Sequence, residues 1–320
     1  MLHKWHLLHI MKVKADFYNT ARKFSETYSE FTHMGPFAKI LIGSISVAYF
    51  AVKWTAPSFD PGSLKGARVL VTGASTGIGE QMAYNYAQFG ARIVITARRE
   101  NILQQVAEKC LSLGAQEALY IAADMASESD PDKVVDFALD KLGGLDYLVL
   151  NHIGSTPFSM WSGEVDHVRW LMKVNFFSYI QMAWRALPSL EQSKGSLVIV
   201  SSLLGKMPGP FTAPYASTKF ALNGFFGSLS HELAMKKSNV SVSICTLGLI
   251  DTESAMEKVR GVVNVPAYPA AEAALNIIKA GATRQLELYY PWFTQIITLC
   301  KDWFPSSSNF FIQNSYNYNP

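Results

Sequence analysis

The sequence predicts an α/β fold in which helices cover both faces of a parallel sheet. Short runs of β-branched and aliphatic residues, such as ARVLVTG and GSLVIVSS, alternate with longer segments of helical periodicity. Continuous apolar runs of this length are typical of strands buried on both faces, and their alternation with helices is typical of βαβ units. Because crossovers between such units are right-handed, the expected architecture is a single doubly wound domain of the Rossmann type.

The expected elements follow one another within residues 66–291, which we interpret as this domain. Strands are expected at residues 67–73, 92–97, 118–124, 145–151, 195–202, 240–248 and 286–291. Helices are expected from the glycine-rich turn to residue 89, at 102–113, 132–141, 165–187 and 271–280, and around the YASTK segment. The remaining divisions are an N-terminal extension (1–36), an apolar segment (37–54), a linker (55–65) and an apolar, aromatic C-terminal tail (292–320).

Composition and charge argue against several classes of site and partner. The chain has 320 residues and a formal net charge of +3, and its basic residues are spread along the sequence. We therefore expect no nucleic-acid partner. The three cysteines, Cys110, Cys245 and Cys300, lack CxxC spacing, so neither a disulfide framework nor a metal site is expected.

The apolar segment 37–54 predicts attachment to a membrane. Its uncharged run lies between Lys39 and Lys53, and it is shorter than the ~20 apolar residues that a spanning helix typically needs. Flanking lysines and aromatic residues can extend the reach of such a run. We interpret the segment as a signal anchor. A cleaved signal peptide and an extra amphipathic helix are the alternatives, and Met34 is an alternative start.

A glycine-rich turn after the first strand predicts a dinucleotide site. The stretch VTGASTGIGEQM has the spacing GxxxGxG, which differs from the commoner GxGxxG. Glycines let the backbone approach a pyrophosphate, and the following helix presents free N–H groups to its charge. The contacts expected from this turn are Gly73, Ser75, Thr76, Gly77, Ile78 and Gly79.

The end of the second strand favours NADP(H) over NAD. An NAD site usually has an acidic residue about 20 residues after the glycines, to bind the ribose 2′-hydroxyl. This strand ends instead in TARR, which contains Arg98 and Arg99. A guanidinium pairs with a 2′-phosphate, which a carboxylate would repel. The alternative is that both are ordinary surface arginines. Asp124 and Asn151, at the ends of the third and fourth strands, are expected to contact the same cofactor.

Tyr215 and Lys219 lie four residues apart in APYASTKFALNGF, which places them on one face of a helix. The segments TGASTGIG, VNFFSY, SS and YASTK occur in this order, and on them the chain resembles the short-chain dehydrogenase/reductase family. The resemblance implies that Tyr215 is the general acid/base, with its pKa lowered by Lys219, which also holds the nicotinamide ribose. It implies that Ser202, with Tyr215, binds the substrate oxygen. It also implies that Asn175 interrupts its helix and holds a water in a proton relay.

The segments around these motifs resemble the 11-beta-hydroxysteroid dehydrogenase type 1 branch of this family. VLNHIG replaces the usual NNAG stretch, and SLLGK, FALNGFFGSL and LGLIDTESAM fit the branch. The further cofactor contacts that the resemblance implies are Met125, His152, Ile153, Ile250 and Thr252. A packed core position suits His152 better than a catalytic role.

The branch implies an NADP-dependent oxidoreductase that interconverts a secondary alcohol and a ketone on a lipophilic, steroid-like substrate. Loops after Ser202 and around Met256 are expected to line its pocket. The branch also implies a homodimer and a catalytic domain in the endoplasmic reticulum lumen, or a secreted form after cleavage. The sequon at Asn239 is compatible with this location. The tail packs in the core or a dimer, or it dips into the bilayer.

Three other functions stay open at this point. One is a retinoid, sphingoid or other lipid carbonyl reductase. Another is a relative that binds NADP without catalysis. The last is a membrane-tethered structural protein that kept only the fold.

Overall fold

The computed structural model describes residues 35–36, 43–44 and 58–317. The chain divides into two units, Met1–Ser58 and Phe59–Pro320, and the second contains the fold described here. Most of the predicted signal anchor, 37–54, lies outside the described residues, so the anchor stays a prediction. Within the described ranges, no helix has the length and apolar character needed to cross a membrane.

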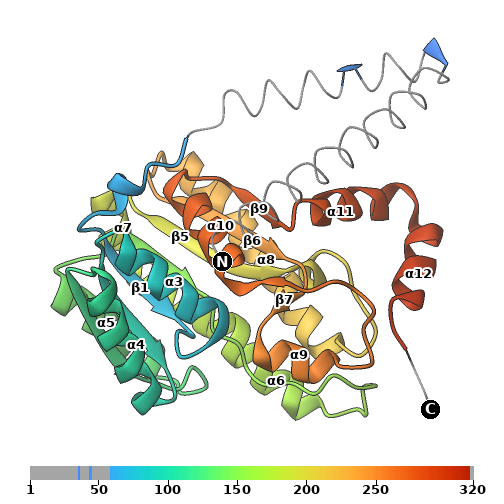
Figure 1. Ribbon diagram of the computed structural model, residues 1–320, viewed down its shortest axis with the longest axis horizontal. Coiled ribbons are helices and arrows are strands. Elements are labelled where there is room, and N and C mark those ends of the chain that lie inside the picture. Colours follow the sequence, from blue (N-terminus) through green and yellow to red (C-terminus); the bar gives the residue numbers. More distant parts are fainter. Residues whose placement is uncertain (1–34, 37–42, 45–57, 318–320) are drawn as a thin grey trace, which may run out of the picture. The chain divides into compact units, whose positions relative to one another are not determined.

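A seven-stranded parallel sheet forms the centre of the second unit, in the order β3-β2-β1-β4-β5-β6-β9 (Figure 1). Its strands are β1 (Arg68–Thr72), β2 (Arg92–Ala97), β3 (Glu117–Ala122), β4 (Tyr147–Leu150), β5 (Ser196–Ser202), β6 (Ser241–Leu247) and β9 (Glu287–Tyr290). The strand order reverses between β1 and β4, which is where open α/β sheets bind ligands. This sheet confirms the predicted doubly wound α/β fold.

Helices cover both faces of the sheet. One layer contains α3 (Gly77–Gln88), α4 (Glu100–Leu113) and α10 (Ala270–Ala282), and the other contains α5 (Asp130–Leu142), α7 (Ser178–Ser193) and α8 (Ala213–Met235). Successive strand residues alternate between the two layers, as the two-residue period of a strand requires. Val198 packs in the first layer, and Leu197 packs in the second.

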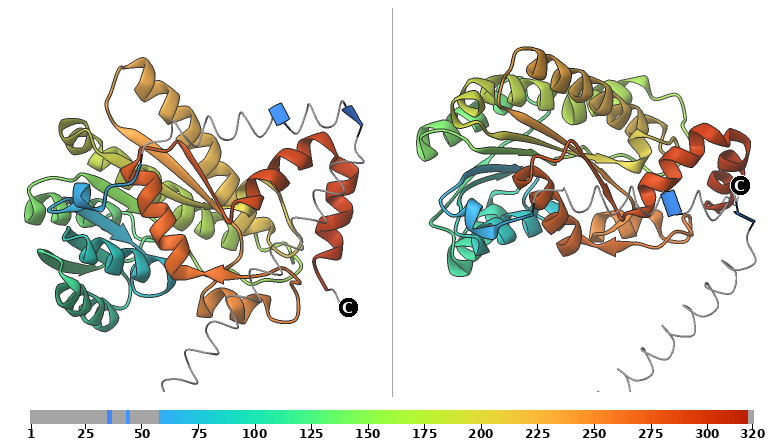
Figure 2. Two further views of the ribbon diagram at one scale, coloured as in Figure 1. Left: turned by 45° about the horizontal axis from the view of Figure 1, so that its top comes forward. Right: turned by 90° about the horizontal axis from the view of Figure 1, so that it is seen from above.

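Several short elements were not predicted from the sequence. They are the 3-10 turns η1 (Pro61–Leu64) and η3 (Leu203–Gly205), the two-residue strands β7 (Ile250–Asp251) and β8 (Tyr268–Pro269), and the helices α9 (Glu253–Val259), α11 (Phe293–Trp303) and α12 (Pro305–Asn314). The two views of Figure 2 show α11 and α12 extending beyond the β9 edge of the sheet. The apolar tail thus contains helices, which the aromatic composition of this segment did not specify.

The helix expected at 165–187 is divided into three parts. It consists of α6 (Val165–Met172), the π-helical turn η2 (Lys173–Phe177) and α7. A π-helical turn inserts one extra residue into the helix and changes the direction of the side chains that follow, and such turns are frequent at functional sites. Asn175 lies in this turn and is fully buried.

An ion pair braces the edge of the sheet opposite the ligand-binding edge. Asp146 accepts hydrogen bonds from the Nε, the Nη2 and the backbone N–H of Arg68, at 2.8–3.0 Å. Burial raises the pKa of the Asp146 carboxyl, but the hydrogen bonds from Arg68 lower it more, so the net pKa is below its usual value. The pair joins the start of β1 to the start of β4.

We predict that Asp146→Asn lowers the free energy of unfolding by about 1.5–3 kcal/mol, the usual contribution of hydrogen bonds to a charged group. Because the pKa of Asp146 is lowered in the folded state, its stabilisation is complete above the usual carboxyl pKa. It is lost as the pH falls through the folded-state value. Urea unfolding should therefore show a larger loss of stability below pH about 4 in wild type than in the variant, which keeps other carboxyls of lowered pKa such as Asp130 and Glu287. Asp136→Asn, which breaks an exposed pair with Arg185, is the control and should leave the stability unchanged.

Candidate functional site

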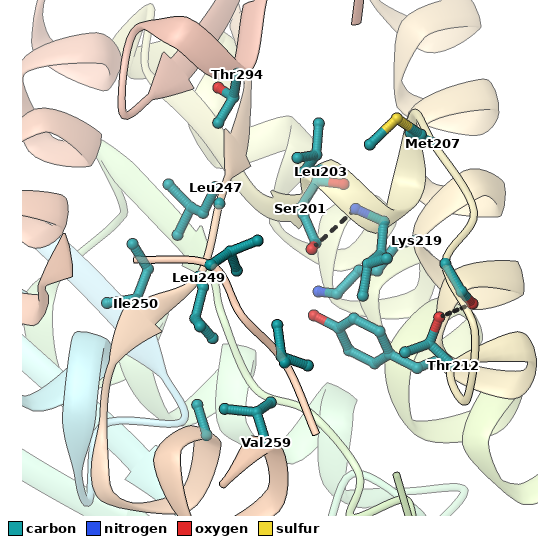
Figure 3. A pocket seen from close by; sticks show the side chains of 18 of the residues that line it. Ser201, Leu203, Met207, Thr212, Lys219, Leu247, Leu249, Ile250, Val259 and Thr294 are labelled. Atoms are coloured by element: carbon teal, nitrogen blue, oxygen red, sulfur yellow. Dashed lines mark hydrogen bonds between the residues drawn. The ribbon is translucent and has the colours of Figure 1, made fainter. Parts of the chain in front are cut away.

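A cavity of about 930 Å³ lies at the carboxyl ends of the central strands and is lined mostly by apolar side chains. Its walls come from the loop after β4, from η3 and the loop that follows, and from α8, α9, α11 and the segment after α12. Figure 3 shows Lys219 on one side of this cavity, with Leu247, Leu249 and Val259 on the other. The sequence-predicted residues that line it are Ile78, Asn151, Ile153, Ser202, Tyr215, Lys219, Ile250 and Thr252.

Tyr215 and Lys219 occupy successive turns on one face of α8. The Lys219 ammonium lies 5.6 Å from the centre of the Tyr215 ring and donates a hydrogen bond of 2.8 Å to the Val200 carbonyl of β5. Lys219 is 1% exposed. Ser202, at the end of the same strand, accepts a hydrogen bond from the Leu204 N–H at 3.2 Å and forms a side-chain hydrogen bond with Tyr215. The structure therefore brings these three predicted residues together.

The ionisation of this group differs from the sequence-based expectation. Lys219 was expected to lower the pKa of Tyr215. Instead, burial raises the pKa of Tyr215 to about 12, although the Ser202 hydrogen bond acts in the opposite direction. Burial also lowers the pKa of Lys219 to about 7. Desolvation thus favours the neutral form of both groups, and the phenol of Tyr215 keeps its proton near neutral pH.

Asn175 is connected to the same helix through Thr218. Its Nδ2 donates to Thr218 Oγ1 at 3.2 Å, and Thr218 donates to the Tyr215 carbonyl at 2.8 Å. The Asn175 Oδ1 accepts from the Gly154 N–H at 2.7 Å, in the loop after β4. The side chain thus links η2, α8 and that loop, and the predicted role in holding a water stays a prediction.

The glycine-rich turn packs closely against the ends of β1 and β4. A Cβ on Gly79 would clash with the Gly73 carbonyl and would lie 2.7 Å from Asn151 Nδ2. A Cβ on Gly73, where φ is +65°, would lie 2.8 Å from the Cα of His152. Thr76 is the N-cap of α3, but its side chain makes no capping hydrogen bond. The turn is therefore shaped for close backbone approach at a helix N-terminus.

The two predicted arginines differ in their contacts. Arg99 reaches back to the glycine-rich turn and donates to Ser75 Oγ at 3.1 Å and to Thr76 Oγ1 at 3.3 Å. Arg98 is exposed. Asp124 is also exposed, and its Oδ1 accepts from the Ala126 N–H at 3.0 Å. The sequence placed both arginines at the end of β2. The fold brings only Arg99 to the Ser75 and Thr76 hydroxyls.

The remaining predicted cofactor residues fall into two groups. Asn151 lies beneath the glycine-rich turn, where Nδ2 donates to the carbonyls of Thr72 and Gly73, and Ile153 is 49% exposed in the cavity wall. Met125 and His152 are buried in the protein interior. The His152 ring bonds to Thr72, Val174 and Ser178, so its side chain is turned away from the cavity.

Much of the cavity wall comes from residues that the sequence did not single out. The expected loop after Ser202 does line it, and the segment around Met256 contributes Ala255 and Val259. The unpredicted contributors include Phe293, Ile297 and Cys300 of α11, and Ile312 and Tyr316 further on. Their signal in the sequence was the apolar, aromatic composition of the tail.

This fold and this site define the class of protein. The family model described as short chain dehydrogenase matches residues 67–263, which include the glycine-rich turn, Asn175, Ser202, Tyr215 and Lys219. The chain belongs to this family of oxidoreductases.

Individual relatives refine the assignment. Hydroxysteroid 11-beta-dehydrogenase 1-like protein of Danio rerio is 67% identical over 284 residues, which cover 89% of this chain and 99% of the relative. The protein of that name from Gallus gallus is 58% identical over 285 residues, with the same coverage of both chains. The one from Homo sapiens is 54% identical over 230 residues, or 72% and 73% of the two chains. These matches confirm the predicted resemblance to this branch.

A solved structure supports the fold. Alcohol dehydrogenase from the archaeon Thermococcus sibiricus, complexed with 5-hydroxy-NADP, aligns with a TM-score of 0.60. It covers 69% of this chain and 94% of its own, at 21% sequence identity. At this identity the likeness supports the doubly wound architecture alone.

We predict that Gly79→Ala lowers the free energy of unfolding by about 1–3 kcal/mol, because the added methyl group overpacks a rigid turn. The matched control is Gly227→Ala in α8, where an added Cβ meets nothing within 4 Å. That change should stabilise the protein by about 0.5–1 kcal/mol through helix propensity. Chemical denaturation measures both, and equal stability of Gly79→Ala and wild type would contradict the tight packing of the turn.

Proposed function

We propose that the protein is an NADP-dependent oxidoreductase that interconverts a secondary alcohol and a ketone on a lipophilic, steroid-like substrate. The observation that carries this proposal is the position of Ser202, Tyr215 and Lys219 at one wall of a mostly apolar cavity. A large apolar pocket with a few convergent polar groups is the usual form of a small-molecule site.

The residues of the chain supply the proton chemistry of this reaction. When bound, the nicotinamide cofactor supplies or accepts the hydride. Because burial holds the pKa of Tyr215 at about 12, its phenol is protonated at neutral pH and can donate its proton to a carbonyl oxygen. The Ser202 hydroxyl, held by the Leu204 N–H, is placed to hydrogen-bond the same oxygen. In the reverse direction, the phenolate accepts the proton of the alcohol.

The residues around the glycine-rich turn fit a dinucleotide with a 2′-phosphate. Gly73 and Gly79 pack against the ends of β1 and β4 with no room for a Cβ. The N-terminus of α3 follows this turn without a side-chain cap, so its N–H groups suit a pyrophosphate. Arg99, with Ser75 and Thr76, gathers one guanidinium and two hydroxyls beside that turn. These groups would hold a phosphate by charge-assisted hydrogen bonds. Lys219 would hold the nicotinamide ribose at the other end of the site.

The apolar walls support a lipophilic substrate. The side of α11 that contains Phe293, Ile297 and Cys300 lines the cavity. On the same helix, Leu299 and Trp303 are 60% and 80% exposed. An apolar surface continuous with an apolar cavity supports the proposal that the tail dips into a bilayer and admits substrate from it. Membrane attachment, the lumenal location and the homodimer stay proposals that rest on the sequence.

We predict that Arg99→Ala weakens NADPH binding about 10- to 100-fold, because charge-assisted hydrogen bonds to the 2′-phosphate contribute about 1.5–3 kcal/mol. NADH lacks this phosphate, so its affinity should change less than threefold. Fluorescence titration of both nucleotides measures the difference. Arg98→Ala is the matched comparison and should have the smaller effect. An equal loss of affinity for NADPH and NADH would assign Arg99 to a general structural role.

We predict that Tyr215→Phe lowers turnover about 10²- to 10⁴-fold, the usual contribution of a general acid, while NADPH affinity stays within threefold of wild type. The assay follows oxidation of NADPH and of NADH by purified protein with a panel of steroid ketones. NADPH-dependent turnover that is lost in the variant supports the reaction, the cofactor and the acid together. NADPH binding without turnover of any steroid, retinal or other lipid carbonyl would favour a non-catalytic relative.

A further inference from the structure

The ring of His152 is buried where segments that form the site meet. Its Nδ1 lies 2.9 Å from Thr72 Oγ1, at the end of β1. Its Nε2 lies 2.7 Å from Ser178 Oγ and 3.1 Å from the Val174 carbonyl oxygen. Val174 belongs to the π-helical turn η2, and Ser178 follows that turn. One side chain thus joins the strand before the glycine-rich turn to the turn that contains Asn175.

The partners of the ring assign its tautomer. The Val174 carbonyl can only accept, so Nε2 carries the proton on that side of the ring. Nδ1 is then the acceptor at 2.9 Å for the Thr72 hydroxyl, whose proton is shared with the Val149 carbonyl at 3.2 Å. The Ser178 hydroxyl donates to the same Val174 carbonyl at 2.6 Å. Burial, with the charge of Lys219, lowers the pKa of His152 to about 3, so the ring is neutral at working pH. A neutral ring with both nitrogens engaged holds a structure and does not exchange protons.

The backbone of His152 extends the same connection to the other side of the site. Its carbonyl accepts from the Tyr179 hydroxyl at 2.7 Å, and the two rings lie 4.5 Å apart. The Tyr179 ring lies 5.8 Å from the ammonium of Lys219. The Cα of His152 is also the atom closest to a Cβ that would be added at Gly73. His152 is therefore in contact with the glycine-rich turn and with Tyr179, whose ring faces the Lys219 ammonium.

We propose that His152 is a positioning residue, which holds the Asn175 turn and the Tyr179–Lys219 contact in register with the glycine-rich turn. This inference rests on the proposed function, because the roles of Asn175 and Lys219 come from the family resemblance. A π-helical turn has irregular backbone hydrogen bonding, so its geometry depends on partners outside the helix. Displacement of a reacting group by about 1 Å can cost about 100-fold in rate, so such a support affects catalysis.

Three substitutions separate the contacts at the Thr72 end of this link from those at the η2 end. In His152→Asn, the short side chain keeps a polar group near Thr72 and does not reach η2. In His152→Gln, the longer amide can still donate to the Val174 carbonyl. Ser178→Ala removes one partner at the far end and leaves the histidine in place. Val135→Ala is the control, because Val135 is fully buried in α5, in the same hydrophobic layer.

Hydrogen–deuterium exchange of the full chain tests the link without any assay of activity. Peptides that cover residues 173–178 should exchange at least tenfold faster in His152→Asn than in wild type. The effect should be smaller in Ser178→Ala and in His152→Gln. In Val135→Ala, exchange of these peptides should stay within twofold of wild type. Unchanged exchange of residues 173–178 in both His152→Asn and Ser178→Ala would overturn the proposal, whether or not the protein is a reductase.

Kinetics test the consequence for catalysis, with NADPH and whichever steroid ketone wild type reduces. At a temperature where every variant is folded, His152→Asn should lower kcat about 10- to 100-fold and leave KM for the ketone within threefold. His152→Gln should recover part of this loss. Equal kcat losses in His152→Asn and Val135→Ala would mean a merely structural role. If wild type reduces no ketone, the proposed function fails, and NADPH binding then tests the positioning role by itself. In that case the role is supported if His152→Asn binds NADPH at least threefold more weakly than Val135→Ala.

Discussion

The buried ammonium of Lys219 is the constraint on which the arrangement of the site depends. Removing an ammonium from water is costly, and the Val200 carbonyl at 2.8 Å and the faces of two tyrosine rings offset only part of this cost. The carbonyl comes from β5, one ring comes from α8, and the other, Tyr179, comes from α7. One strand and two helices must therefore meet at fixed positions around a single cation. The same burial lowers the pKa of Lys219 and keeps Tyr215 protonated.

Residues at one edge of the sheet stabilise the fold, and residues at the opposite edge form the candidate site. At one edge, Arg68 and Asp146 join neighbouring strands through direct hydrogen bonds. The opposite edge carries the close-packed glycine turn, a π-helical turn and a large apolar cavity, none of which favours stability by itself. Loops at that edge can vary in shape because the rigid sheet positions them. His152 is the contact that transmits this rigidity from β1 to the Asn175 turn.

Regular elements could be predicted because their signals are local. Buried strands such as β1 and β5 contain continuous apolar runs, and helices such as α4 and α5 have helical periodicity. The resemblance implied that Asn175 interrupts the helix at 165–187, and η2 lies there. Periodicity alone did not indicate this turn, because partners such as His152 lie in the loop after β4. Helix α11 was missed although Phe293, Ile297 and Cys300 recur at helical spacing, because the tail was interpreted from its apolar, aromatic composition and not from its periodicity. Met125, a predicted cofactor contact, is buried, and its contact with the cofactor stays a prediction.

The sequence by itself determined the order of the strands and helices, the glycine-rich turn, and the placement of Tyr215 and Lys219 on one helix face. Each of these follows from spacing and local backbone geometry. Only the tertiary structure decided that Arg99 reaches Ser75, that the His152 ring bridges β1 and η2, and that the pKa of Tyr215 is raised and not lowered. The physical reason is that burial and contacts between distant segments set these properties, and both depend on how the whole chain packs.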